Sequence, residues 1–197
     1  MKILCIFAIG IVIISTCFYQ HSVEASDAQT DYETGLRYHN SHDYGKALKW
    51  LSKAADQGNA DAQGLLGFMY YKGEGVTQNY AEALKWFRKA VDQGDADTQG
   101  LLSVIYYYGE GYTQNYVESL KWARKGANQG NAVAQWVLGL IYYHGEGGVS
   151  KDPIEAKNWF RKAAAQGDKV GLYLMKQLAE LGYLKQGPPP PGALRKY

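Results

Sequence analysis

The chain has little cysteine and little net charge. Only Cys5 and Cys17 are cysteines among the 197 residues, and both lie in the first apolar segment. If that segment is removed, no cysteine remains and disulfides cannot stabilise the rest. The net charge of +2 is too small to indicate nucleic acid binding. The hydrophobic content of 46% is nevertheless enough for the core of one folded domain.

Catalytic and metal-binding motifs are also missing. The sequence has no serine–histidine–acid set, no zinc-ligand spacing and no phosphate-binding loop. His39 and His42 lie three residues apart beside Asp43, but His144 is the only other histidine after the first segment. A solvated polar loop explains this pair better than a metal site. We therefore expect no catalytic residue, no metal and no cofactor.

The first segment has the features of an export signal. Lys2 precedes an apolar run from Ile3 to about Phe18, and Val23 and Ala25 are the small residues that a signal peptidase accepts. This pattern predicts a signal peptide over residues 1–25, cleaved after Ala25, and a periplasmic or secreted protein. The alternative is an uncleaved N-terminal membrane anchor, because a run of ~17 residues is at the lower limit for spanning a bilayer.

One stretch of sequence recurs along the chain. "YYKGEGVTQNYAEALKWFRKA" at residues 70–90 returns as "YYYGEGYTQNYVESLKWARKG" at 106–126 and as "YYHGEGGVSKDPIEAKNWFRKA" at 142–163. Each copy holds a Gly-Glu-Gly loop, with the acids at Glu74, Glu110 and Glu146. Three evenly spaced acids would be an odd way to build one catalytic site. We therefore interpret the loop as a helix stop followed by a turn.

Each copy carries start and stop signals for two helices. In each copy, a capping residue is followed three positions later by a glutamate, and this pair predicts the start of a helix. The predicted caps are Asn79, Asn115 and Asp152. Glycines predict the ends of these helices and of an earlier one, at Gly58, Gly94, Gly130 and Gly167. Caps for the helix that comes next follow at Asn59, Asp95, Asn131 and Asp168. The unit is therefore predicted to be an antiparallel helix pair.

The stretch "ADAQGLLGFMYYKGEGVTQNYAEALKWFRKAVDQG" resembles the Sel-1-like repeat, a relative of the tetratricopeptide repeat with a longer loop. The resemblance implies an all-α fold, a right-handed α-solenoid of antiparallel helix pairs. Repeats are expected at about residues 28–59, 60–95, 96–131 and 132–168, with a closing helix over 169–184. Lys169 and Lys176 stand where earlier copies have Ala or Gly, which suits the end of a stack.

An apolar and aromatic stripe that varies between copies is the candidate binding surface. The resemblance places it on the concave face, where such solenoids hold peptides or partner domains. Tyrosine and tryptophan are favoured at interfaces. The predicted binding residues are Phe68, Tyr71, Lys72, Tyr107, Tyr108, Trp136, Tyr143 and His144. Tyr108, Trp136 and His144 are expected to be the most exposed, and packing between copies is the alternative role.

The expected function is that of an exported scaffold or adaptor that binds a protein or peptide partner. The resemblance suggests roles in envelope regulation or in contact with a host cell. One alternative is a cell-wall or β-lactam-type hydrolase, by analogy with cysteine-rich Sel-1-like proteins, although this chain lacks their cysteines. A purely structural repeat protein is the other alternative. Neither nucleic acid binding nor, after cleavage, stable membrane insertion is expected.

The chain ends in a proline-rich tail at residues 185–197. Its four consecutive prolines favour an extended polyproline II segment, which serves as a spacer or as a ligand for an aromatic groove. A disordered tail is nevertheless the preferred interpretation. A further option is that the tail folds back onto the aromatic stripe of its own chain.

Overall fold

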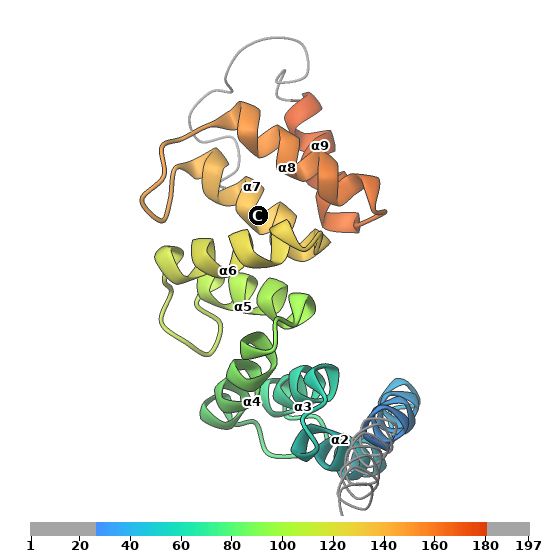
Figure 1. The fold of residues 1–197 in the computed structure, drawn as a ribbon. Coiled ribbons are helices and arrows are strands. Elements are labelled where there is room, and N and C mark those ends of the chain that lie inside the picture. The colour runs from blue at the N-terminus through green and yellow to red at the C-terminus, as the bar shows by residue number, and fades with distance from the viewer. Residues whose placement is uncertain (1–26, 181–197) are drawn as a thin grey trace, which may run out of the picture. The chain divides into compact units, whose positions relative to one another are not determined.

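The computed structural model describes residues 27–180, and all regular secondary structure in that range is helical (Figure 1). A helix over residues 27–40 comes first. The following helices are α2 (Tyr44–Asp56), α3 (Ala60–Lys72), α4 (Tyr80–Asp92), α5 (Ala96–Tyr108), α6 (Tyr116–Asn128), α7 (Ala132–His144), α8 (Pro153–Ala165) and α9 (Lys169–Glu180). The predicted signal peptide, its cleavage site and the proline-rich tail lie outside the described residues.

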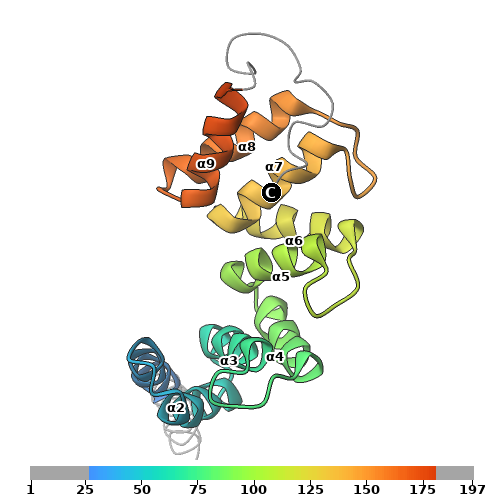
Figure 2. The same ribbon diagram turned by 180° about the vertical axis from the view of Figure 1, so that it is seen from behind.

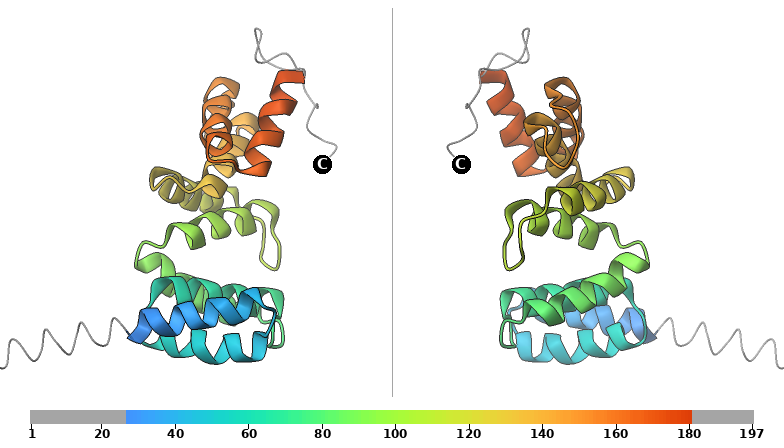
Figure 3. Two further views of the ribbon diagram at one scale, coloured as in Figure 1. Left: turned by 90° about the vertical axis from the view of Figure 1, so that its right-hand side faces the viewer. Right: turned by 90° about the vertical axis from the view of Figure 1, so that its left-hand side faces the viewer.

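The described chain divides after Gln93 into two compact units. The first unit contains the helix over residues 27–40 and α2, α3 and α4, which Figures 2 and 3 show lying alongside one another. Its core is formed by Leu51, Leu66 and Met69, all fully buried. Half-buried aromatic rings, among them Tyr38 and Trp86, pack against this core.

The second unit contains α5 to α9. Its buried side chains come from all five helices, so α9 is an integral part of the core. α9 contributes the buried residues Leu174 and Leu178, and α7 contributes Val137 and Ile141 among others. Figure 1 shows α7, α8 and α9 packed together. The closing helix predicted at residues 169–184 is thus present over its described part.

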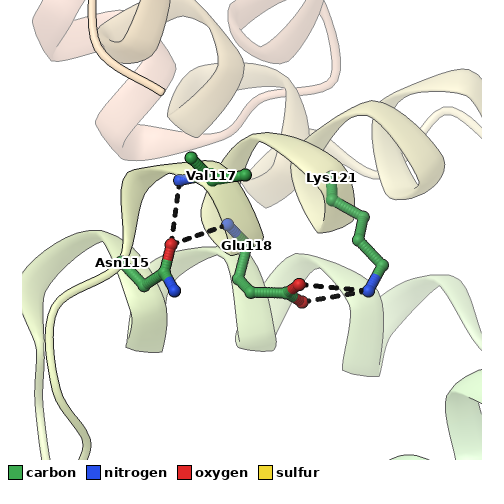
Figure 4. Close-up of polar contacts among 4 residues, drawn as sticks. All are labelled: Asn115, Val117, Glu118 and Lys121. Carbon is green, nitrogen blue, oxygen red and sulfur yellow. Dashed lines mark hydrogen bonds and ion pairs between the residues drawn. The ribbon is translucent and has the colours of Figure 1, made fainter. Parts of the chain in front are cut away.

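The helix caps lie where the sequence predicts them. The Asn115 side-chain oxygen accepts hydrogen bonds from the amides of Val117 and Glu118, both at 3.1 Å (Figure 4). Asp152 caps α8 in the same way, and Asn79 caps α4 with one such bond, from the amide of Glu82. These contacts satisfy amide groups that have no partner inside the helix.

A glutamate three residues after a cap is expected to accept a hydrogen bond from the amide of the cap residue, and at Asn115 this reciprocal bond is not formed. The Glu118 carboxylate faces Lys121 at 3.1 Å and does not return to the cap (Figure 4). The amide of Asn115 donates instead to the carbonyl of Tyr106, at 2.9 Å. Asn79 and Asp152 donate likewise to Tyr70 and Tyr142. The cap residue therefore ties the start of one helix to the end of the previous helix.

Glycine allows the two helices of a pair to approach closely. A Cβ at Gly67 would lie 2.6 Å from the nearest ring carbon of Phe87, which is fully buried. Gly139 faces the ring of Phe160 in the same manner. The phenyl ring of α4 or α8 thus occupies the space that a side chain on α3 or α7 would take.

Over residues 27–180, no helix is long and apolar enough to cross a membrane.

Candidate functional site

The candidate site is built on the ends of α5 and α7. Each helix finishes with two adjacent rings and then a glycine in the left-handed region, Gly109 at φ 74° and Gly145 at φ 76°. These glycine amides close the helices by donating to Ile105 and Ile141. The positive φ ends each helix abruptly, so its last residue stands at an edge where one side is open to solvent.

Both helix ends hold their last two rings edge to face. The centroids of Tyr107 and Tyr108 are 5.0 Å apart, and those of Tyr143 and His144 are 5.1 Å apart. In each pair the first ring is buried and the second is exposed. Aromatic pairs favour this geometry, which fixes the exposed ring against a buried one.

A hollow of about 210 Å³ lies between α5, α7 and α9 in the second unit. Its lining is largely aromatic and aliphatic. The lining residues are Tyr107, Tyr108, Leu140, His144, Val170, Tyr173 and Leu174. Tyr108 is 53% exposed, Val170 41% and Tyr173 38%, so its rim presents apolar surface to solvent. A hollow of this kind accepts an apolar or aromatic side chain.

The hollow contains three of the predicted binding residues, namely Tyr107, Tyr108 and His144. The prediction that Trp136 is exposed is wrong, because this side chain is 7% exposed and belongs to the core of the second unit. Tyr143 is buried as well. Packing, the alternative role considered for the stripe, therefore applies to these two residues.

The predicted residues of the first unit form a separate group on α3. Tyr71 is buried and Phe68 is half-buried, with ring centroids 6.5 Å apart. The Lys72 ammonium lies 5.9 Å from the Phe68 ring centroid and 5.0 Å from that of Tyr71. Lys72 thus covers both rings with a cation–π contact. Phe68 and Tyr71 are thus an aromatic pair covered by Lys72, and none of the three residues lines the hollow of the second unit.

Sequence reasoning missed the contribution of α9. Val170, Tyr173 and Leu174 line the hollow, yet none of them belongs to the repeated pattern. The available signal was the helical spacing of these three apolar residues beside Lys169 and Lys176. Leu140 also lies in the hollow and belongs to the varying stripe of α7.

Partial burial at the hollow favours the neutral forms of His144 and Tyr108. Partial desolvation of the ring at the hollow lowers the pKa of His144, Glu146 opposes this shift, and the charge of Lys151 adds to it. Partial burial raises the pKa of Tyr108, helped by the carboxylates of Glu110 and Glu146. The imidazole is therefore mainly neutral near pH 7, and the phenol keeps its proton as a hydrogen-bond donor.

Two of the Gly-Glu-Gly acids, Glu74 and Glu146, lie beside groups of the preceding repeat. The Glu74 carboxylate lies 2.7 Å from Nε2 of His39. Burial raises the pKa of Tyr107, and the nearby Glu146 carboxylate raises it further. Because these acids face the helix ends of the preceding repeat, the interpretation of the loop as a structural element is supported. No group of three or more metal-binding side chains occurs in the described part of the chain.

Comparison with known proteins identifies the repeat. A family model described as Sel1 repeat matches residues 31–59, 60–95, 96–131 and 132–168. Among solved structures, c5321, a protective antigen present in uropathogenic Escherichia coli strains and displaying an SLR fold, is 38% identical with a TM-score of 0.67. The match covers 79% of this chain and 34% of that chain, so this chain spans about a third of the c5321 length.

A Sel1 repeat protein from Oxalobacter formigenes is 30% identical with a TM-score of 0.71, over 83% of this chain and 67% of that chain. No curated protein matches the chain. Repeats of this type generally mediate protein–protein interaction. The helix pairs, their caps and their glycine ends agree with the predicted all-α solenoid class. Because the four matched segments cover more than half of its residues, the chain belongs to the Sel1 repeat family.

Proposed function

We propose that this protein is an interaction scaffold that binds an extended peptide or partner segment at the hollow between α5, α7 and α9. The observation that carries the proposal is the rim of Tyr108, Val170 and Tyr173, which are exposed apolar side chains around a hollow of about 210 Å³. Buried anchor side chains in such pockets supply most of the affinity of small interfaces. The lining is suited to binding, and the proposal assigns no catalytic residue.

The rigidity of the lining supports this role. Tyr107, Leu140 and Leu174 belong to the buried core of the second unit, so the base of the hollow is held in place by packing. The ring of Tyr107 in turn supports that of Tyr108 edge to face. Binding a partner therefore requires little further ordering of this protein, and little conformational entropy is lost on its side.

The proposal places the protein outside the cytoplasm, as a periplasmic or secreted adaptor in envelope regulation or host contact. The apolar segment after Lys2 and the small residues Val23 and Ala25 support export. The description of c5321 as a protective antigen of uropathogenic strains supports exposure to a host. A membrane anchor is the alternative that the export experiment in the Discussion tests.

The test compares two double variants of the chain from Ser26 to Tyr197. The first, Tyr108→Ser with Tyr173→Ser, removes two rings of the hollow, both at least 38% exposed. The control, Val117→Ser with Ile154→Ser, removes two exposed apolar side chains at the starts of α6 and α8. Partners captured from an envelope extract are identified by mass spectrometry, and their affinities are then measured by calorimetry.

We expect one captured partner to bind the parent and the control equally and the hollow variant at least about tenfold more weakly, which corresponds to the loss of one anchor contact. Circular dichroism confirms that both variants fold. Equal affinity of the parent and the hollow variant for every captured partner would overturn the proposal.

A further inference from the structure

We propose that the hollow between α5, α7 and α9 is a docking site for the chain's own proline run, Pro188–Pro191, so that the tail competes with external partners. This inference rests on the proposed function for the location of the binding site. It adds the class of ligand, a polyproline segment, and a regulation, self-competition.

The lining of the hollow has the chemistry that recognises proline. Polyproline II segments dock in grooves lined with aromatic rings, because the pyrrolidine rings pack on aromatic surfaces. Tyr107, Tyr108 and Tyr173 supply rings, and His144 adds a fourth. Carbonyl groups in a polyproline segment have no internal hydrogen bond and accept from tyrosine hydroxyls. The hydroxyl of Tyr108 is protonated near pH 7 and can donate such a bond.

The proline run is within reach of the hollow. Residues of α9 rise about 1.5 Å each, so Val170 lies about 15 Å along the axis from Glu180, where the described chain ends. Residues 181–187 separate that point from Pro188. Seven residues span up to about 23 Å when extended. The tail is therefore long enough to return along α9 without any change in the helices.

Charge also favours this occupant. Residues 181–197 contain Lys185, Arg195 and Lys196 and no acidic side chain. The carboxylates of Glu110 and Glu146 act on Tyr108 at the rim of the hollow. Three charged groups shift the pKa values of Tyr108 and His144. Two of them are the carboxylates of Glu110 and Glu146, and the third is the cation Lys151, which acts on His144. A basic tail is thus attracted to the α5 side of the hollow.

Tethering makes even a weak contact effective. Residues 181–187 join α9 to the proline run, and a short covalent link gives an effective concentration in the millimolar range. A proline run also loses little conformational entropy on binding, because its backbone is restricted beforehand. An external ligand for the same hollow must displace the tail, so its apparent affinity falls in proportion to the free fraction.

The experiment uses the chain from Ser26 to Tyr197, which holds every described residue. A tail variant replaces all four prolines, Pro188–Pro191, with serine. The probe is a fluorescent peptide of residues 185–197, and fluorescence anisotropy measures its binding to the parent, the tail variant, and the tail variant carrying Tyr108→Ser with Tyr173→Ser. We expect the tail variant to bind the peptide about tenfold more tightly than the parent. The added tyrosine substitutions should abolish binding.

Amide NMR spectra of the parent and the tail variant provide a readout that needs no added ligand. We expect shift differences at Tyr108, His144, Val170 and Tyr173, independent of protein concentration. The proposal is overturned if the spectra coincide over residues 27–180, or if the peptide binds the parent and the tail variant equally. Differences that grow with protein concentration would assign the hollow to a second copy and would also overturn it.

The outcomes distinguish this inference from the proposed function. If the tyrosine substitutions release an envelope partner but the peptide does not bind, the tail proposal fails and the scaffold proposal stands. If the peptide binds the hollow but no partner depends on these tyrosines, the tail proposal stands and the scaffold proposal fails.

Discussion

Adjacent aromatic residues of this chain have different roles, and their burial decides which. Phe87 is fully buried on α4, whereas its neighbour Trp86 is half-buried with the Lys89 ammonium 3.9 Å from its ring centroid. The same arrangement recurs in the last repeat, where Phe160 is buried and Lys162 covers Trp159. Trp86 and Trp159, although larger, are therefore less buried than Phe87 and Phe160.

We predict that Phe87→Ala lowers the free energy of unfolding by about 3–5 kcal/mol, since a large buried ring is removed and a cavity is left. Trp86→Ala is the matched control and should cost clearly less, because the indole is only partly buried. Urea unfolding followed by circular dichroism measures both. A loss as large for Trp86→Ala as for Phe87→Ala would contradict the assignment of the core.

The pKa of His144 provides a second prediction at the residue scale. Burial and Lys151 lower it below 6.5, and Glu146 opposes them. Tyr143 faces the imidazole from its own helix, and Tyr108 and Tyr173 line the same hollow. As the pH falls below about 6.5, the unfolded chain takes up a proton at this histidine before the folded chain does. This group therefore makes the folded state less stable at acidic pH.

We expect the His144 ring proton signal to titrate in NMR spectra with a midpoint below 6.5. The stability lost between pH 7.5 and 5.0 should be smaller in His144→Gln than in the parent, because the variant has no group to protonate there. A midpoint at or above 6.5 would show that the imidazole is not desolvated as described.

At the scale of the helix pair, the sequence predicted the features that depend on residues close together in the chain. The caps of Asn79, Asn115 and Asp152 and the glycine ends follow from contacts within four residues, which single positions specify. The burial of Trp136 and the role of α9 depend on helices that are distant in sequence. Gly100 stands in the corresponding place of the previous repeat, so the repeat gave no precedent for a buried indole. Pattern alone thus found Tyr108 and His144 but not Tyr173.

The Gly-Glu-Gly loop supplies a prediction at this scale. Gly147 and Gly148 both have positive φ, 67° and 85°, but only Gly147 is crowded, since a Cβ there would lie 2.6 Å from the Tyr116 carbonyl oxygen. Gly148→Ala should cost about 1–2 kcal/mol, the strain of a left-handed residue. Gly147→Ala should cost about 1–3 kcal/mol more, because it also pushes the loop away from α6. Urea unfolding compares the two variants.

Equal costs at the two glycines would mean that the loop does not pack against the start of α6. The contact matters because it connects two repeats. Gly75 approaches Tyr44 at the start of α2 in the same way, with a Cβ distance of 2.8 Å to the tyrosine Cβ. The loops therefore join successive helix pairs in both units, which explains why their glycines and glutamates recur.

At the scale of the whole molecule, the question is where the helix pairs act. The described residues contain no helix able to span a membrane, and the sequence places its long apolar run before Ser26. If the first segment is a cleaved signal, the protein leaves the cytoplasm without cysteines and has no disulfide to stabilise it. If the segment is retained, the same helix pairs are held at a membrane surface.

We predict that the full chain, expressed in a bacterium, yields a protein whose first residue is Ser26, recovered from the periplasm or the medium. The physical reason is that Val23 and Ala25 fit the small pockets of a signal peptidase, whereas the apolar run is barely long enough to anchor. Intact-mass measurement of the fractionated protein checks this, with Ala25→Trp as the control that blocks cleavage. Recovery of the uncleaved parent chain in the membrane fraction would establish the anchor instead, and would confine its partners to those within reach of that membrane.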